Sequence, residues 1–413
     1  MVVAVLLRQH CRTTLWASPD QFTHACYSDV PVLFVSRGFA SGVLPYLERW
    51  QGGYLEQPVG TGALLELLTV LAPDTPHQAR TVFDLAALLL LVALLALLTA
   101  VKALSGRRPW DAALVAFSPV LLTASLVSLD LVAVSLAVLG VLAFARHRPV
   151  LAGALLGLAV AVRPLGVLVV VALLLLGVRS GRWRPVLKTA GAAVLAWVVV
   201  NLPVAVAAPE GWRASLPDLG QQSVGYGSIW LLPQLAGRPL PPAASRVLFL
   251  LGLVVVLAAT LLFVLASRVR PRVPVVVLCL VGGVLAVSLS VPVQASLWVL
   301  PFAALAVPRW RDLLLWGGTE AVYDTVTWFY IYGQSDANRA APPWVYGVVL
   351  VARLLALAWL VAMAVRGARD PALDPVRVAG GGQSPGSGRE SAAADPCAGE
   401  LAHAPDVFVV RLG

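Results

Sequence analysis

Long apolar runs, separated by short polar segments, set the pattern of the chain. The runs at 85–100, 186–206 and 247–266 approach or reach the length that a helix needs to cross a hydrocarbon core of about 30 Å. Within each run the apolar residues are continuous and do not alternate with polar ones, which is typical of membrane helices. The pattern therefore predicts an all-α polytopic membrane protein.

Basic residues gather in the short polar segments between these runs. The clusters are GRRPW (106–110), RHR (146–148), RSGRWRPVLK (179–188), RVRPR (268–272), PRWR (308–311) and RGAR (366–369). An excess of Lys and Arg marks cytoplasmic loops, so we place every cluster in the cytoplasm. The predicted spans are then 81–104, 111–127, 131–145, 149–162, 165–178, 189–208, 246–267, 273–290, 295–308, 313–332 and 344–365. They amount to about eleven crossings.

This threading divides the chain into segments of different character. Residues 1–7 are interpreted as the remnant of a first transmembrane helix. Residues 8–80 are an extracytoplasmic first loop with interfacial helices, one of them at 59–72, and residues 81–366 are the transmembrane bundle. Residues 367–413 are rich in Gly, Pro, Ser and Asp, which cannot build a core. We predict that they form a disordered cytoplasmic tail.

Composition narrows the range of partners and cofactors. The chain is 59% hydrophobic and 12% charged, with a mean hydropathy of +0.84 and a net charge of +9. Because the positive charge lies in short loops, it orients the protein in the bilayer and does not indicate nucleic acid. The histidines are scattered and no His or Cys pair has ligand spacing, so neither a metal nor another cofactor is expected. Cys11 and Cys26 share the outer loop, where oxidation is permitted, and are candidates for a disulfide.

One long polar stretch stands out in the outer loop: CYSDVPVLFVSRGFASGVLPYLERWQGGYLEQPVGTG, residues 26–62. Asp29 begins a segment that predicts a short surface helix at 30–37. It is either a helix N-cap or a general base that faces a cavity, and the two roles are compatible. Glu56 is either an exposed loop charge or a group that binds sugar hydroxyls. Tyr27 and Arg37 are further candidates for binding a polar ligand such as a sugar.

Two charged residues border apolar runs at the predicted outer face. Asp130 is either an interfacial loop acid or an acid that faces a polar cavity, because acids inside a membrane are costly. Arg163 stands directly before Pro164 at a predicted helix break. Its planar guanidinium suits a phosphate at the membrane boundary, and a snorkelling arginine is the alternative.

Aromatic and amide side chains add further candidates at the outer tips. The loop at 201–234 carries Trp212 and Tyr226, and Gln294 lies at another tip. Such groups suit a sugar or a lipid headgroup, but an aromatic belt at the membrane interface has the same composition. We count these three residues among the candidates for binding the sugar or the acceptor.

An ordered set of motifs resembles a known family. The stretches CYSDVPVLFVSRGFASGVLPYL, YLEQPVGTG and SLDLVAVSLAVLGVLAFARHRPVLAGALLGLAVAVRPLGVLVVVALLLL are followed by NLPVAVAAPEGW, GSIWLL and SLWVLPFAALAVPRWRDLLLW. Together, over about residues 11–335, they resemble the actinobacterial polyprenol-phosphate-mannose-dependent α-mannosyltransferases of glycosyltransferase family 87. The chain departs from the family where EYPV reads EQPV at Glu56, where a lysine before Tyr-Pro reads Arg163-Pro164, and where SPQ reads VPVQ at Gln294.

The resemblance implies a GT-C fold and an inverting membrane glycosyltransferase. Such an enzyme transfers mannose or a related hexose from a polyprenyl-phosphate sugar to a glycolipid or glycan acceptor of the cell envelope. Asp29 would be the general base and Arg163 would hold the donor phosphate, while Glu56, Asp130 and Gln294 orient the sugar or acceptor. A monophosphate donor needs less charge neutralisation than a pyrophosphate, so a metal-free site is chemically reasonable. The resemblance places the protein in the cytoplasmic membrane, with an extracytoplasmic active site and a cytoplasmic C-terminus.

Two other classes of function share part of this pattern. A multi-span transporter or lipid flippase has the same apolar core but predicts charges at mid-span and paired broken helices. A non-catalytic scaffold predicts outer acids that share no cavity. The candidate polar residues collect at the outer face, which favours the transferase.

Overall fold

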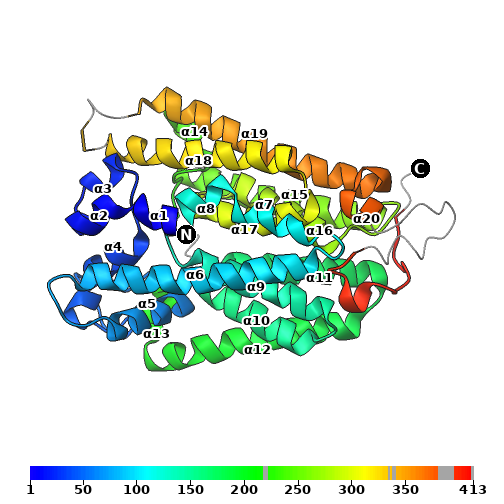
Figure 1. Cartoon of the computed structure of the whole chain (residues 1–413), viewed down its shortest axis with the longest axis horizontal. Helices are drawn as coiled ribbons and strands as arrows, with labels where there is room; N and C mark the ends of the chain where they lie inside the picture. Colours follow the sequence, from blue (N-terminus) through cyan, green and yellow to red (C-terminus); the bar gives the residue numbers. More distant parts are fainter. Residues whose placement is uncertain (217–221, 334, 337–340, 380–394, 411–413) are drawn as a thin grey trace.

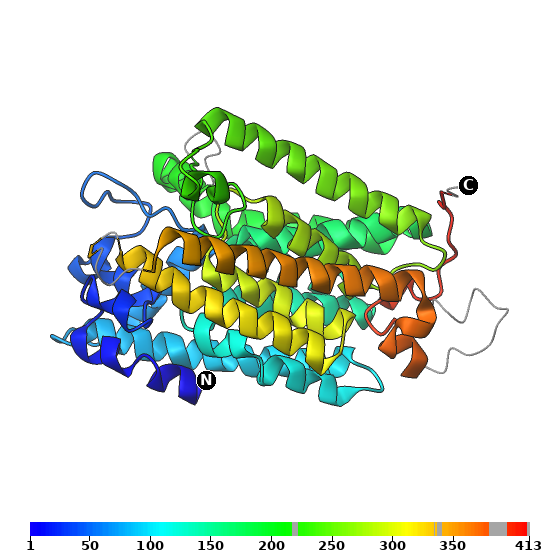
Figure 2. The same cartoon turned by 90° about the horizontal axis from the view of Figure 1, so that it is seen from above.

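The computed structural model describes residues 1–216, 222–333, 335–336, 341–379 and 395–410 of the protein. The described residues form an all-helical fold without a strand, and the longer helices lie side by side along one direction (Figures 1 and 2). Within these described ranges, four helices are long and apolar enough to cross a membrane: α6 (Gln78–Leu104), α12 (Trp183–Ala207), α15 (Pro242–Ala266) and α19 (Pro343–Arg369). The all-helical architecture with membrane-length helices agrees with the sequence prediction. The number of crossings stays a prediction.

Shorter helices pack between and beside the long ones. They are α9 (Asp130–Ala145), α10 (Pro149–Val162), α11 (Val167–Ser180), α16 (Val273–Val287) and α17 (Ser296–Ala306). Every residue of α17 is buried, so this helix forms the centre of the bundle. In α12 and α15, by contrast, only 11% of the most apolar window is buried inside the protein. Their apolar side chains therefore face outward, as helices in contact with lipid do.

The region of the predicted span at 111–127 is not one helix. It consists of α7 (Ala112–Ala116) and α8 (Pro119–Ala124) with a break at Ser118. Pro119 cannot donate a backbone hydrogen bond to the preceding turn, and the Ser118 hydroxyl accepts a bond from the Val120 N–H at 3.3 Å. A new helix therefore starts at the proline. The apolar run concealed this Ser-Pro start signal, so a single helix does not cover 111–127. The crossing of the membrane by this segment stays a prediction.

The N-terminal segments form short helices at one end of the bundle. They are α1 (Val2–Leu6), α2 (Gln9–Thr14), α3 (Asp20–Thr23), α4 (Asp29–Ser36) and α5 (Val59–Leu71). They lie at the left of Figures 1 and 2, away from the C-terminus. A disulfide joins Cys11 to Cys26, as the shared outer loop predicted, with 5.9 Å between the Cα atoms. The helices α4 and α5 match the expected helices at 30–37 and 59–72 within one residue.

The predicted cytoplasmic loops meet at the opposite end of the bundle. Arg108 donates to the carbonyl oxygen of Pro308 at 3.3 Å, which connects two of the basic clusters. Arg179 and Arg270, from two further clusters, share the carboxylate of Asp406 at 2.7 Å each. This end carries the C-terminal segment at the right of Figures 1 and 2. Loops that the charge pattern assigned to one side therefore do lie on one side.

The C-terminal segment differs from the predicted disordered tail. Asp374 accepts two hydrogen bonds from the buried Arg272, at 2.7 and 3.0 Å. Beyond the undescribed residues 380–394, Asp395 accepts a bond from the Val273 N–H at 2.8 Å, and Cys397 is buried. Buried arginines require paired acids, and the tail supplies them. The prediction of disorder over 367–413 was therefore wrong for residues 367–379 and 395–410, because a composition argument ignores such specific partners. Residues 380–394 and 411–413 of the predicted tail lie outside the described residues.

Close helix packing holds α10 against α12. Gly153 and Gly157 of α10 face α12, and a Cβ atom on either would press against the carbonyl oxygen of Thr189 or Ala193. Two small residues spaced by four let membrane helices approach to backbone contact. Gly191 of α12, by contrast, has open space where a Cβ would stand.

We expect Gly157→Ala to destabilise the protein by about 1–3 kcal/mol, because the added methyl group overpacks the α10–α12 contact. Gly191→Ala is the matched control and should stabilise slightly or have no effect, because alanine is the better helix former. Thermal unfolding of both purified variants in detergent checks this. Equal melting temperatures for the two variants would contradict the close contact.

Candidate functional site

A pocket of about 240 Å³ opens among the segments at the N-terminal end of the bundle. Aromatic side chains form much of its wall, and the polar groups include a carboxyl and an amide. The lining residues are Phe22, Tyr27, Asp29, Val127, Tyr226, Val291, Pro292, Val293, Gln294, Tyr323, Thr327, Trp328 and Ile331. A concave site with an aromatic wall and few polar groups is the usual form of a small-molecule site.

Asp29 is held in this wall by its backbone. It is the first residue of α4, and its N–H donates to the carbonyl oxygen of Val127 at 2.6 Å. The N-cap position belongs to Ser28, and no side chain caps the helix. The alternative interpretation of Asp29 as a helix N-cap was therefore wrong. Its carboxyl group is left to line the pocket.

Burial controls the protonation of Asp29. Loss of water contact raises the pKa of its carboxyl to about 6, the nearby Asp130 adds to the rise, and Arg163 and the Tyr27 hydroxyl oppose it. Gln294 donates from Nε2 to Oδ2 of Asp29 at 3.4 Å. A carboxyl with a pKa close to neutral is suited to accept a proton.

Arg163 and Asp130 form an ion pair next to Asp29. Arg163 has extended backbone between α10 and the 3₁₀ helix η3 (Pro164–Gly166), as the predicted break requires. Its Nε donates to Oδ2 of Asp130 at 2.7 Å, and its Nη1 donates to Oε1 of Gln57 at 2.7 Å. Among the described residues, its Nη2 has no hydrogen-bond partner, and 17% of the side chain is exposed. The guanidinium is therefore oriented by protein groups while one nitrogen stays available.

Asp130 is occupied by protein partners on both oxygens. The Ser128 hydroxyl donates to Oδ2 at 2.6 Å, and the indole N–H of Trp298 donates to Oδ1 at 3.1 Å. Only 5% of the residue is exposed. A fully satisfied, buried carboxylate does not bind a sugar directly, so Asp130 acts on the site by holding Arg163.

The other predicted residues divide into two groups. Tyr27, Tyr226 and Gln294 line the pocket together with Asp29. Glu56 and Arg37 form an ion pair at 3.4 Å outside the pocket wall, with 70% and 31% of their side chains exposed. Trp212, in α13 (Pro209–Ala214), donates from its indole N–H to Asn201 at 3.2 Å and does not line the pocket.

The structure adds three residues that the sequence interpretation did not select. Trp298 lies in α17, directly after the 3₁₀ helix η4 (Val293–Ala295) that carries Gln294, and its indole N–H contacts Asp130. Gln57 follows Glu56 directly and, instead of it, contacts Arg163. Trp328 stacks on Tyr27 at 4.8 Å between ring centroids. No sequence signal points to Trp328, because its partner lies about three hundred residues away.

The pocket itself offers little to a metal ion. Among the described lining residues, Asp29 is the only carboxylate and there is no His or Cys, whereas a bound metal takes several such ligands. The pocket can instead present an aromatic face to a ring and a carboxylate to a hydroxyl. Arg163 does not line the pocket, but its guanidinium is close enough to interact electrostatically with Asp29.

Comparison with known families gives one match. The model of the family described as glycosyltransferase family 87 matches residues 58–292, which is more than half of the 413-residue chain. The match begins directly after Gln57 and ends just before Gln294, so it includes Asp130, Arg163 and Tyr226. No curated protein matches the chain.

We expect Asp130→Asn to destabilise the fold, because breaking a buried ion pair leaves Arg163 without its countercharge, at a cost of about 3–5 kcal/mol. Glu56→Gln removes a carboxylate from an exposed pair and should cost at most about 1 kcal/mol. Unfolding of both variants, followed in detergent, compares the two pairs. Similar losses of unfolding free energy in the two variants would contradict the larger cost of breaking the buried pair.

Proposed function

The chain belongs to glycosyltransferase family 87, and we propose that it transfers mannose, or a related hexose, from a polyprenyl-phosphate sugar to a glycolipid or glycan acceptor. The transfer inverts the anomeric carbon and takes place on the extracytoplasmic face of the cell membrane. The observation that carries the proposal is the Asp29 carboxyl in the wall of an aromatic pocket, with its pKa raised to about 6 by burial.

Asp29 is the general base of the proposed reaction. The acceptor hydroxyl oxygen attacks the anomeric carbon and forms the new C–O bond, while its proton passes to the Asp29 carboxylate. The bond between the anomeric carbon and the phosphate oxygen breaks, and polyprenyl phosphate leaves with that electron pair. Gln294, whose amide donates to Asp29 at 3.4 Å, keeps the carboxylate turned toward the pocket. A positioned base of this kind contributes about 10²–10⁴-fold to the rate.

Arg163 is the group that we assign to the donor phosphate. Asp130 and Gln57 hold two of its guanidinium nitrogens at 2.7 Å, so Nη2 is oriented before the substrate arrives. Preorganised donors stabilise charge that develops in a transition state without a cost of reorganisation. The departing phosphate gains one negative charge in this step, and an adjacent fixed cation is the group that stabilises it.

The aromatic wall supports the sugar part of the proposal. Tyr27 and Trp328 stack with 4.8 Å between centroids, and Phe22 and Trp328 with 6.0 Å. Their faces offer an apolar surface to a sugar ring, and Tyr226 and Thr327 add polar atoms to the same pocket. A volume of about 240 Å³ lies below the range of drug-sized sites. It suits a single sugar unit, with the polyprenyl chain left outside the pocket in the bilayer.

We expect membranes that carry the protein to transfer label from polyprenyl-phosphate-mannose into lipid or glycan. Asp29→Asn should lower the rate by about 10²–10⁴-fold, because the amide cannot accept the proton. Asp74→Asn is the matched control, since it makes the same chemical change at an exposed acid of the same N-terminal region. The radiolabelled product, separated into lipid and glycan fractions, also identifies the acceptor.

The donor is tested in parallel with polyprenyl-phosphate-glucose. Transfer from the glucose donor alone would replace mannose but keep the mechanism. Equal transfer by the wild type and Asp29→Asn would remove Asp29 from the reaction. Absence of transfer from both donors by folded protein would overturn the proposed activity.

The pH dependence of transfer provides a second test. Because Asp29 must be ionised to accept a proton, and its pKa lies at about 6, kcat/KM should be constant above that pH. It should fall about tenfold per pH unit below it. Initial rates at low donor concentration, measured in wild type and Asp74→Asn, should show this acid limb in both. A flat profile from about pH 4.5 to 8 would contradict a base with this pKa.

A further inference from the structure

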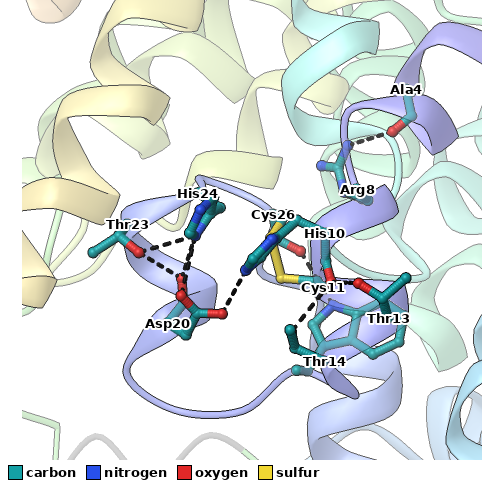
Figure 3. Close-up of a disulfide and its surroundings, with 11 residues drawn as sticks. Ala4, Arg8, His10, Cys11, Thr13, Thr14, Asp20, Thr23, His24 and Cys26 are labelled. Atoms are coloured by element: carbon teal, nitrogen blue, oxygen red, sulfur yellow. Dashed lines mark hydrogen bonds and ion pairs between the residues drawn. A yellow bond between two sulfur atoms is a disulfide. The ribbon is translucent and has the colours of Figure 1, made fainter.

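Two histidines and an aspartate meet outside the pocket, at the N-terminal end of the bundle. Nε2 of His10 lies 2.6 Å from Oδ2 of Asp20, and Nδ1 of His24 lies 3.2 Å from Oδ1 of the same carboxyl. The two imidazole rings stack with 3.5 Å between centroids. Each residue offers one ligand atom, and these three atoms lie within 4.8 Å of one another. Figure 3 shows both rings turned toward the aspartate.

The disulfide brings these three side chains together. Cys11 directly follows His10, and Cys26 comes two residues after His24. The cross-link joins cysteines that are fifteen positions apart and encloses Asp20 (Figure 3). Such a cross-link reduces the freedom of the chain before any ligand binds. The three groups are therefore held close together by covalent structure and not only by their mutual hydrogen bonds.

We propose that His10, Asp20 and His24 form a binding site for a divalent transition-metal ion of the Zn²⁺ class. Imidazole nitrogens combined with one carboxylate oxygen suit zinc, whereas calcium and magnesium require more oxygen ligands. Three protein ligands leave a fourth tetrahedral position for water. Between 38% and 44% of each side chain is exposed, so the ion reaches the site from the aqueous side.

The distances allow this coordination after a small adjustment. Two ligands at 2.0–2.2 Å from a tetrahedral zinc ion stand about 3.4 Å apart. The 3.2 Å from His24 Nδ1 to Oδ1 of Asp20 fits this separation, but the 2.6 Å from His10 Nε2 runs to the other oxygen, Oδ2. Rotation of the carboxyl group must therefore present one oxygen to both nitrogens, and the contact between His10 and Asp20 must widen. The widening is less than about 1 Å, which rotation of partly exposed side chains supplies. The ion takes the place of the hydrogen bond between His10 and Asp20.

A bound ion at this place acts on the wall of the pocket. Phe22 lies between Asp20 and His24 in the chain, lines the pocket and stacks on Trp328 of α18 (Trp310–Tyr332). Coordination of the residues on either side of Phe22 fixes its backbone. The ion is therefore a structural one that rigidifies the aromatic wall, and its binding does not depend on the proposed transferase activity.

Metal binding is tested on the purified full-length protein in detergent, with its disulfide intact and traces of metal removed by a chelator. We expect one equivalent of Zn²⁺ to bind, and Co²⁺ to give the visible absorption of a four-coordinate site. His10→Gln, His24→Gln and Asp20→Asn should each weaken Zn²⁺ binding by at least about 100-fold, because each removes a ligand. His77→Gln, an exposed histidine of the same N-terminal region, is the matched control and should bind as the wild type does.

Two further measurements separate loss of the site from loss of the fold. Each variant should melt at the wild-type temperature in chelator, and its disulfide should persist by mass spectrometry. Added Zn²⁺ should raise the melting temperature of wild type and His77→Gln in a concentration-dependent way, but not that of His24→Gln. Sub-stoichiometric binding by the wild type, or equal binding and equal thermal shifts in all variants, would overturn the proposal.

Discussion

The ion pair between Arg163 and Asp130 is the interaction on which the geometry of the site depends. It joins the broken end of α10 to the start of α9 at 2.7 Å, and Gln57 and Trp298 add bonds from the loop before α5 and from the central helix α17. Four segments that are distant in sequence are thus held at one point. A buried ion pair is worth little as a source of stability, but removal of one partner is costly. Here the ion pair fixes the positions of the segments that it joins.

The segment before α9, which carries Asp130, also fixes the position of Asp29. The loop that presents Ser128 and Asp130 offers the Val127 carbonyl oxygen to the Asp29 N–H at 2.6 Å. The catalytic candidate is therefore anchored by backbone to the segment that holds the arginine. In the proposed reaction, Asp29 becomes neutral when it accepts the proton, and the Arg163–Asp130 pair stays balanced. The site would then lose one negative charge as the leaving phosphate gains one. Under this proposal, the compensation accounts for two acids near a single arginine.

Periodicity and charge could predict the arrangement of the bundle, because membranes constrain both. Apolar runs must be helical to satisfy their backbone groups, and the basic clusters do assemble at one end. The break at Arg163, the disulfide and the helices near 30–37 and 59–72 also follow from local signals, since Pro164 and the short apolar length act within a few residues. The C-terminal segment shows the limit. Its composition indicates disorder, but Asp374 and Asp406 neutralise arginines that are distant in sequence.

The residues of the site show the same difference between local sequence signals and contacts that depend on the tertiary fold. Arg163 could be selected from sequence because a charged residue between apolar runs is costly, and Asp29 because it lies in the long polar stretch of the outer loop. Their roles in the reaction stay predictions. Sequence could not show that Gln57 contacts Arg163 while its neighbour Glu56 forms an exposed pair with Arg37. The directions of adjacent loop side chains depend on the tertiary fold. The cluster of His10, Asp20 and His24 escapes a search for ligand spacing, because its two histidines are fourteen positions apart in the chain and the Cys11–Cys26 bond brings them together. In a small cross-linked segment, residues next to the two cysteines are close in space even when they are far apart in sequence. A search for metal ligands in an oxidised outer loop must therefore count the path through the disulfide as well as the path along the chain.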